Sequence, residues 1–177
     1  MLKIMNNMDV INNAELYKGL NKEQENALKV LRSGANCFLT GSAGTGKSYL
    51  LRRFIESSRS ALVTAASGIA AVGIGGHTLH HALRVPVRII TPGECRFDDA
   101  LWSRLSRSNY YYPFHSCDTV VIDEISMVRA DVFKWVAGYL RAERERAEHS
   151  IQLVCCGDFF QLPPVINGKE TESWQRV

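Results

Sequence analysis

Four short apolar runs divide the chain, and none of them alternates with polar residues. They are rich in Val, Leu, Ile and Cys and cover residues 36–40, 61–65, 119–123 and 151–156. Continuous apolar runs of this length are typical of strands that are covered on both faces. Helical spacing lies before and between them, at 20–34, 46–57, 68–72, 79–83 and 130–148. This alternation predicts an α/β fold, a mainly parallel sheet with helices on both faces and right-handed crossovers.

The first helix carries the clearest boundary signals. Asn21 is a good N-cap, Gln24 stands three residues later as in a capping box, and Gly34 is a natural stop. Residues 1–19 carry a weak pattern, so we expect a flexible lead-in followed by one domain over 20–177. Residues 84–115 hold three prolines and an aromatic triplet, and we expect an excursion there with a short helix near 98–105.

Composition narrows the class of protein. A chain of 177 residues with 46% hydrophobic content suits one globular domain, and its formal charge of +3 permits a nucleic-acid surface without requiring one. The five cysteines match no zinc or disulfide spacing, which favours a reducing compartment. His77, His80 and His81 with Cys95 do not form a zinc pattern either.

The N-terminus resembles neither a secretion signal nor a transit peptide, and no run is long enough to span a membrane. We therefore expect a cytoplasmic location if the source is bacterial or viral, and a nuclear one if it is eukaryotic.

A glycine-rich loop follows the first apolar run and opens a helix. It matches G-x-x-x-x-G-K-[ST] in full, with the residues Gly41, Ser42, Ala43, Gly44, Thr45, Gly46, Lys47 and Ser48. Glycines let the backbone amides wrap a phosphate, and the helix N-terminus adds a positive dipole end. Lys47 is expected to reach the β- and γ-phosphates of ATP, and the Ser48 hydroxyl is expected to bind Mg²⁺. The alternative is a tight strand-to-helix turn that matches the motif by chance.

Two adjacent acids end the third apolar run. Asp123 is placed to hold Mg²⁺ through its water shell, which leaves Glu124 free to polarise a water aimed at the γ-phosphorus. Phosphate-loop kinases and GTPases generally lack the second acid, so the pair predicts ATP hydrolysis. The alternative is that both acids simply favour the start of the next helix.

Gln161 follows the fourth apolar run, between Gly157-Asp158 and Pro163-Pro164. A neutral amide held in a rigid turn after a strand can sense a γ-phosphate by hydrogen bonding and report it to a neighbouring domain. The equally weighted alternative is a capping turn whose glutamine faces water.

Four segments in this order resemble the petite-integration-frequency (PIF-type) family of superfamily 1 DNA helicases, with RecD-like enzymes as near relatives. The segments are GSAGTGKS, VTAASGIAAVGIGGHTLHHAL, VIDEISMV and GDFFQLPPV, and the second is the most specific. The helical stretch from Ser126 to Arg146 also resembles one peculiar to this family. The resemblance covers nearly the whole chain from Leu20 onward.

This resemblance implies a RecA-like domain in which the Ile151 strand lies between the phosphate-loop strand and the Asp123 strand. It also implies that Gln24 reads adenine. The family moves 5′ to 3′ along single-stranded DNA and unwinds duplexes, including G-quadruplexes and RNA–DNA hybrids. The expected function is therefore that of an ATP-hydrolysing motor domain for unwinding in DNA replication, repair, recombination or telomere maintenance.

The resemblance places the DNA strand along the second segment. Its candidate contacts are hydroxyls, a free amide and a ring, from Thr64, Ser67, Thr78, Gly68 and His80. Residues 49–111 also hold eight arginines against four acids, which is consistent with phosphate contact. The alternative is a packed helix with a glycine turn and solvated arginines.

The family's motor needs a second RecA-like domain, which supplies arginines to the transferring phosphoryl group. Residues 166–177 resemble no part of it, so we expect the 177-residue chain to bind Mg·ATP modestly, hydrolyse it very slowly and not unwind DNA. Two other functions stay open: a non-motor nucleotide-dependent switch or binding module, and, ranked last, a phosphate-loop kinase.

Overall fold

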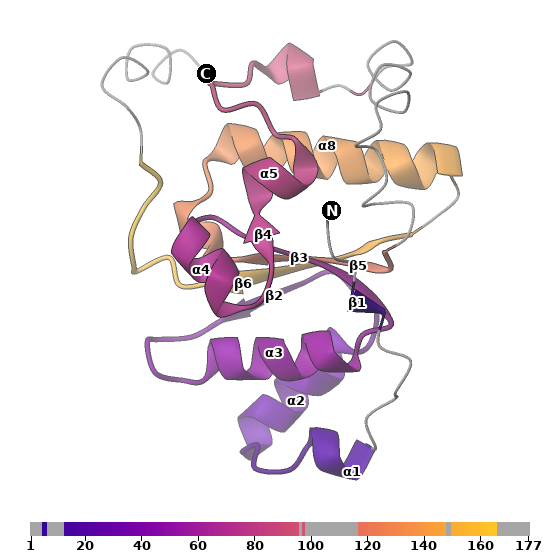
Figure 1. The fold of residues 1–177 in the computed structure, drawn as a ribbon, viewed down its shortest axis with the longest axis vertical. Coiled ribbons are helices and arrows are strands. Elements are labelled where there is room, and N and C mark those ends of the chain that lie inside the picture. The colour runs from indigo at the N-terminus through magenta and orange to yellow at the C-terminus, as the bar shows by residue number, and fades with distance from the viewer. Residues whose placement is uncertain (1–4, 7–12, 96, 98–116, 148–149, 166–177) are drawn as a thin grey trace.

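A sheet sandwiched between helices forms the centre of the molecule (Figure 1). The structure is a computed structural model and describes residues 5–6, 13–95, 97, 117–147 and 150–165. The strands run in the order β1-β3-β5-β6-β2, and β4 also pairs with β3. Their bounds are β1 Met5–Asn6, β2 Cys37–Thr40, β3 Ser60–Ala65, β4 His77–Thr78, β5 Thr119–Asp123 and β6 Gln152–Gly157.

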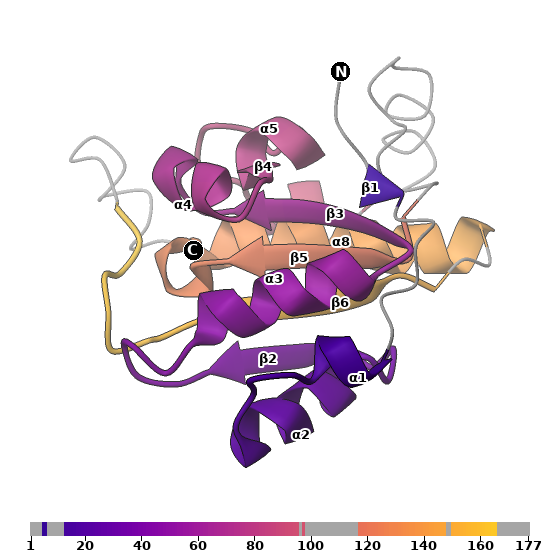
Figure 2. The same ribbon diagram turned by 60° about the horizontal axis from the view of Figure 1, so that its bottom comes forward.

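All described strand pairs are parallel except β1 with β3, which is antiparallel. β6 lies between β5 and β2, as expected from the resemblance. Ala65 pairs with Asp123, and Thr40 pairs with Gly157. The carboxyl ends of β2, β3, β5 and β6 therefore meet at one edge of the sheet (Figure 2).

Helices α1 (Asn13–Leu16), α2 (Lys22–Leu31) and α3 (Lys47–Ser57) cover one face of the sheet (Figure 1). Their leucines and Phe54 pack with Val63, Val121 and Val154 in one apolar cluster. The predicted capping box is present in α2, since Asn21 Oδ1 accepts from the Gln24 amide at 2.9 Å and Gln24 Oε1 accepts from the Asn21 amide at 3.1 Å.

The other face is covered by α5 (Leu79–Leu83) and by the long helix α8 (Ala130–Ala147) (Figure 1). Trp135 and Tyr139 of α8 pack around Phe97 at ring-centroid distances of 5.1 and 5.4 Å. Helix α4 (Gly68–Gly73) follows β3, and short 3₁₀ turns cover Pro92–Cys95 and Ile125–Met127. The predicted helical stretch from Ser126 is thus interrupted, and the α-helix begins at Ala130.

β2 differs from the prediction of a strand covered on both faces. It lies at the end of the described sheet, and Phe38 is 44% exposed. β3 and β5, in the middle, are buried throughout as predicted. An apolar run gives a strand's hydrophobicity but not its place in the sheet, which is why the edge position was missed.

Within residues 1–19 the structure places β1 against β3 and buries Leu16 completely. Elements of two and four residues are too short to produce a periodic pattern, so the sequence did not indicate them. The helix expected near 98–105 lies outside the described residues.

Candidate nucleotide site

The glycine-rich loop leaves β2 and enters α3, as the motif requires. Gly44 and Gly46 have φ values of 79° and 87°, which glycine adopts without strain. Gly46 is the N-cap of α3, and no side chain caps the helix. The first amides of an eleven-residue helix therefore face the loop without a side-chain acceptor, and this arrangement suits an anion.

Lys47 and Gln24 line a pocket of about 200 Å³ beside this loop, together with residues of α2 and β2. Lys47 Nζ donates to the carbonyls of Gly41 at 2.6 Å and Ser42 at 3.1 Å, so its ammonium lies against the loop backbone. Gln24 Nε2 donates to Thr45 O at 3.1 Å. Gln24 thus joins the capping box of α2 to the loop.

Asp123 and Glu124 end β5 at the same edge of the sheet. Asp123 is 5% exposed, and its Oδ1 accepts from the Glu124 amide at 3.0 Å. Glu124 holds a left-handed backbone with φ 54° and ψ 44°, which is uncommon for a residue other than glycine. Its side chain makes no cap hydrogen bond to the following turn, so helix capping does not account for the second acid.

The phosphate loop and the two acids are separated only by β6. Two interstrand spacings put the ends of β5 and β2 about 10 Å apart. Gly157 at the end of β6 allows a close approach, since a Cβ there would lie 3.0 Å from the amide nitrogen of Ile125. The turn that carries Glu124 therefore packs directly on β6, beside the loop.

Cys156 of β6 lies among these charged groups. Burial raises the pKa of its thiol, and the Asp123 carboxylate raises it further through charge and a side-chain hydrogen bond. The charge of Lys47 lowers that pKa, and the charge of Glu124 raises it. One buried sulfur thus has Asp123, Lys47 and Glu124 as its charged neighbours.

The donor set fits magnesium. Ser48 offers a hydroxyl and Asp123 a carboxylate, the hard oxygen ligands that Mg²⁺ uses alongside phosphates and water. In the described part of the chain, no group of three or more His, Cys, Asp or Glu side chains is arranged to hold a metal. A cation here would therefore depend on phosphate oxygens for part of its coordination.

Gln161 lies in a turn after β6, where its amide donates to Asp158 O at 3.0 Å. Its side chain is exposed, and no described hydrogen bond joins it to the phosphate loop. The neighbouring Phe159 and Phe160 are 66% and 101% exposed. In this structure Gln161 therefore has the features of the alternative, a capping turn whose glutamine side chain faces water.

Thr64 is a correction among the residues expected to contact DNA. Its side chain is fully buried, and its hydroxyl donates to Val121 O at 2.6 Å. The hydroxyl therefore ties β3 to β5 and is not exposed at the surface. The sequence shows that a hydroxyl is present but not that a neighbouring strand occupies it.

The other four residues of this set lie near the carboxyl edge of the sheet. Ser67 and Thr78 cap α4 and α5, accepting from the amides of Ala70 at 3.2 Å and His81 at 3.3 Å. Gly68 is exposed at the start of α4. The structure thus brings Ser67, Gly68 and Thr78 to one side of the molecule, with both hydroxyls already accepting a hydrogen bond.

His80 is half-buried on the wall of a cavity of about 260 Å³ that Arg129 also lines. Burial lowers the pKa of His80, the charge of Arg129 lowers it further, and Asp131 opposes them. These effects together favour the neutral form of the ring. A neutral imidazole can stack or exchange hydrogen bonds, but it does not attract phosphate by charge.

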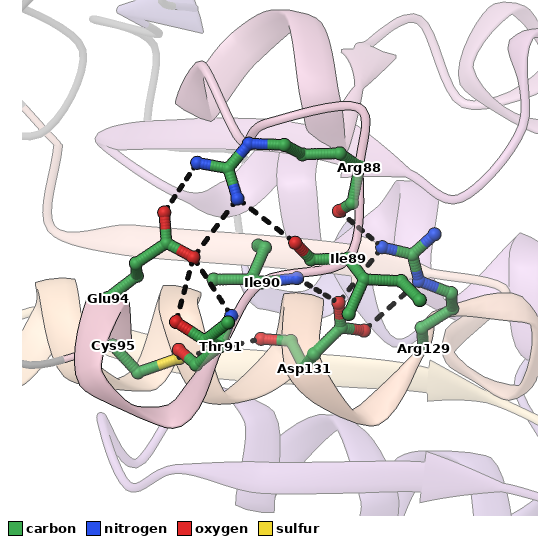
Figure 3. A network of polar contacts seen from close by, with 8 residues as sticks. All are labelled: Arg88, Ile89, Ile90, Thr91, Glu94, Cys95, Arg129 and Asp131. Atoms are coloured by element: carbon green, nitrogen blue, oxygen red, sulfur yellow. Dashed lines mark hydrogen bonds and ion pairs between the residues drawn. The ribbon is translucent and has the colours of Figure 1, made fainter. Parts of the chain in front are cut away.

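A polar network that sequence reasoning missed fastens the neighbouring loop to the start of α8 (Figure 3). Asp131 is 3% exposed and accepts from Arg129 Nε at 3.0 Å, Arg129 Nη2 at 2.9 Å and the Ile90 amide at 2.9 Å. Arg129 also donates to Arg88 O at 2.6 Å, and Arg88 forms an ion pair with Glu94. Acids in a first helical turn are common, so the sequence carried no signal for this contact.

In the described residues no helix is long and apolar enough to cross a membrane.

The chain is similar to known proteins along most of its length. A family model described as PIF1-like helicase matches residues 19–176. The ATP-dependent DNA helicases PIF1 of Danio rerio and Homo sapiens are 40% and 38% identical to the chain over 168 residues. Each alignment covers 89% of this chain and 25% of the relative, so the chain spans about a quarter of the length of these proteins.

Solved structures give the same result for the fold. A Pif1 helicase from Bacteroides in complex with ADP-AlF3 and single-stranded DNA is 34% identical, with a TM-score of 0.68 over 89% of this chain and 36% of that one. The Pif1 helicase from Candida albicans is 36% identical, with a TM-score of 0.65 over 86% and 35%. The fold is thus the RecA-like α/β fold of these helicases. With a phosphate loop, an Asp-Glu strand end and a family match along most of its length, the chain belongs to the PIF1-like helicase family.

Proposed function

We propose that this chain is the ATP-binding and hydrolysing motor domain of a 5′-to-3′ DNA helicase. The observation that carries the proposal is the shared sheet edge at which the phosphate loop meets Asp123 and Glu124. The names of the relatives support it, since they are ATP-dependent DNA helicases. The process served is DNA replication, repair, recombination or telomere maintenance, with a nuclear location in a eukaryote and a cytoplasmic one otherwise.

In the proposed mechanism the loop amides and Lys47 hold the phosphates of ATP. Lys47 exchanges its contacts with the Gly41 and Ser42 carbonyls for β- and γ-phosphate oxygens. Ser48 and Asp123 would hold a Mg²⁺ ion, which would supply positive charge to the phosphates. Glu124 orients the attacking water toward the γ-phosphorus and accepts a proton from that water.

Gln24 and Gln161 take part at the two ends of the nucleotide. Gln24 lines the pocket on the side of α2, where an amide offers both a donor and an acceptor to adenine. Gln161 follows the strand next to Asp123, and its exposed amide is free to turn toward the γ-phosphate when ATP is bound.

Single-stranded DNA is the proposed partner, and the family's G-quadruplexes and RNA–DNA hybrids are further candidate substrates. Ser67, Gly68, Thr78 and His80 lie near the carboxyl edge of the sheet, next to the nucleotide site. Hydroxyl, amide and neutral ring contacts hold a strand without reading its sequence. The Bacteroides relative described above was solved with single-stranded DNA.

A nucleotide-dependent switch is the second candidate, because large apolar side chains surround Gln161. Phe159, Phe160 and Leu162 are 66%, 101% and 68% exposed, which suits a turn that reports nucleotide state to another surface. In this alternative ATP binding is the function, and hydrolysis is incidental.

Substitution of Glu124 tests the proposed function against this alternative. Glu124→Gln is expected to leave ATP affinity unchanged and to lower single-turnover hydrolysis about 10²–10⁴-fold. Glu145→Gln on α8 is the control and keeps the wild-type rate. Equal rates of hydrolysis in Glu124→Gln and the wild type would contradict the motor function and favour the nucleotide-dependent switch.

A further inference from the structure

Cys156 shares a sheet face with Asp123. Ile122 pairs with Cys155, so the next residues along these parallel strands, Asp123 and Cys156, lie side by side. Val121 and Cys156 belong to the apolar cluster beneath α3, and alternation puts Asp123 on that same face. The phosphate-loop helix therefore covers both side chains.

Cys156 is 1% exposed, and the strand register places its side chain beside that of Asp123. The Asp123 carboxylate accepts from the Glu124 amide at 3.0 Å. The carboxylate thus has two neighbours from different strands: the Glu124 amide, which donates to it, and the buried Cys156 thiol of β6, which the register places beside it. Partners of this kind set the direction in which a metal-binding carboxylate presents its remaining lone pairs.

We propose that Cys156 is a positioning residue, whose thiol holds the Asp123 carboxylate in the direction that serves a magnesium-bound nucleotide. This inference rests on the proposed function of the site. The thiol touches neither nucleotide nor metal and acts only through Asp123.

The adjacent cysteine supplies a matched control. Cys155 is also buried, at 8% exposure, but it packs in the cluster on the opposite face beneath α8. Burial raises the pKa of Cys155 to about 11. Its truncation removes the same atoms from the same strand without touching Asp123.

The test measures the affinity of the 177-residue chain for ADP by calorimetry, in Mg²⁺ and again in EDTA. Cys156→Ala is expected to weaken binding in Mg²⁺ by about tenfold and to leave binding in EDTA unchanged. Cys156→Ser, which restores a donor, is expected to return to within about twofold of the wild type. Cys155→Ala is expected to match the wild type in both buffers. Cys156→Val fills the volume left by alanine and is expected to behave like Cys156→Ala.

Each other outcome counts against the proposal in a distinguishable way. A loss of equal size in Mg²⁺ and EDTA, or a serine variant as weak as alanine, makes Cys156 a core residue only and overturns the positioning role. The positioning role is overturned as well if Cys155→Ala matches Cys156→Ala. If the wild type takes up no nucleotide in either buffer, the proposed function fails together with the inference.

Discussion

Glu124 keeps a strained backbone at the point where the chemistry is proposed. A left-handed conformation costs a residue with a side chain on the order of 1–3 kcal/mol, so the surrounding contacts must impose it. Two of them are visible: the bond from its amide to Asp123, and the close packing of Ile125 on Gly157. The left-handed backbone at Glu124 turns the chain away from the direction of β5. Asp123 and Glu124 therefore present their carboxylates in different directions.

Thr64 gives a prediction at the same scale. Thr64→Val keeps the shape and removes the hydroxyl that donates to Val121 O, so we expect a loss of about 1 kcal/mol in the free energy of unfolding. The affinity for single-stranded DNA is expected to stay unchanged, because the side chain is buried. Urea unfolding and fluorescence anisotropy with a labelled oligonucleotide measure the two quantities. Weaker DNA binding at unchanged stability would restore Thr64 to the DNA surface.

At the scale of elements, the Arg129–Asp131 network holds the 88–94 loop against α8. The contacts come from the residue before the helix, from its first turn and from a loop backbone some forty residues earlier in the chain. The Arg129 and Asp131 side chains are 13% and 2% exposed, so the pair is shielded from solvent. The loop is therefore fixed beside His80, on the side where the DNA contacts are proposed.

Asp131→Asn is expected to destabilise the chain by roughly 3 kcal/mol at pH 7, because it removes the buried carboxylate that pairs with the Arg129 charge. Burial by itself would raise the pKa of Asp131, but hydrogen bonds from Arg129 and Ile90 outweigh it, and the net pKa is lowered. A lowered folded-state pKa gives stability that is complete above the ordinary value near 4 and is lost as the pH falls through the folded value.

Urea unfolding of the wild type and of Asp131→Asn between pH 7 and pH 2 checks this. The difference between their unfolding free energies should shrink below about pH 4. Glu94→Gln is the control: its pKa is lowered to about 2, chiefly by the side-chain hydrogen bond from Arg88, but the pair is exposed, so little change in stability is expected. A constant difference down to pH 2 would contradict the role given to the carboxylate.

The sequence predicted the bounds of individual helices and strands better than the contacts between them. The bounds of β5 and α5 and the capping box of α2 were predicted closely, because apolar runs and cap residues are local signals. The edge position of β2, the burial of the Thr64 hydroxyl and the contact of Asp131 with Ile90 are set by residues far apart in the chain. No local pattern encodes such contacts.

At the scale of the whole molecule, the RecA-like sheet brings together three segments that lie far apart in the chain. They are the phosphate loop after β2, the acids Asp123 and Glu124 at the end of β5, and the turn after β6. Parallel strands share a carboxyl edge, so a sheet of this kind places the phosphate loop and the Asp123-Glu124 pair on the same side. The position of β6 between β5 and β2 was predicted only from the family resemblance. The residues of a single segment do not determine the order of strands in a sheet. The chain covers 25% of its vertebrate relatives, and the helicase activity proposed here is that of the longer proteins.

A calorimetric titration of the 177-residue chain with ATP, in Mg²⁺ and in EDTA, tests the central claim most directly. One saturable site that is tighter in Mg²⁺ is predicted, with uptake abolished in Lys47→Ala and the advantage of Mg²⁺ lost in Asp123→Asn. Absence of uptake by the wild type, or an affinity that neither Mg²⁺ nor these substitutions change, would contradict a shared magnesium–nucleotide site.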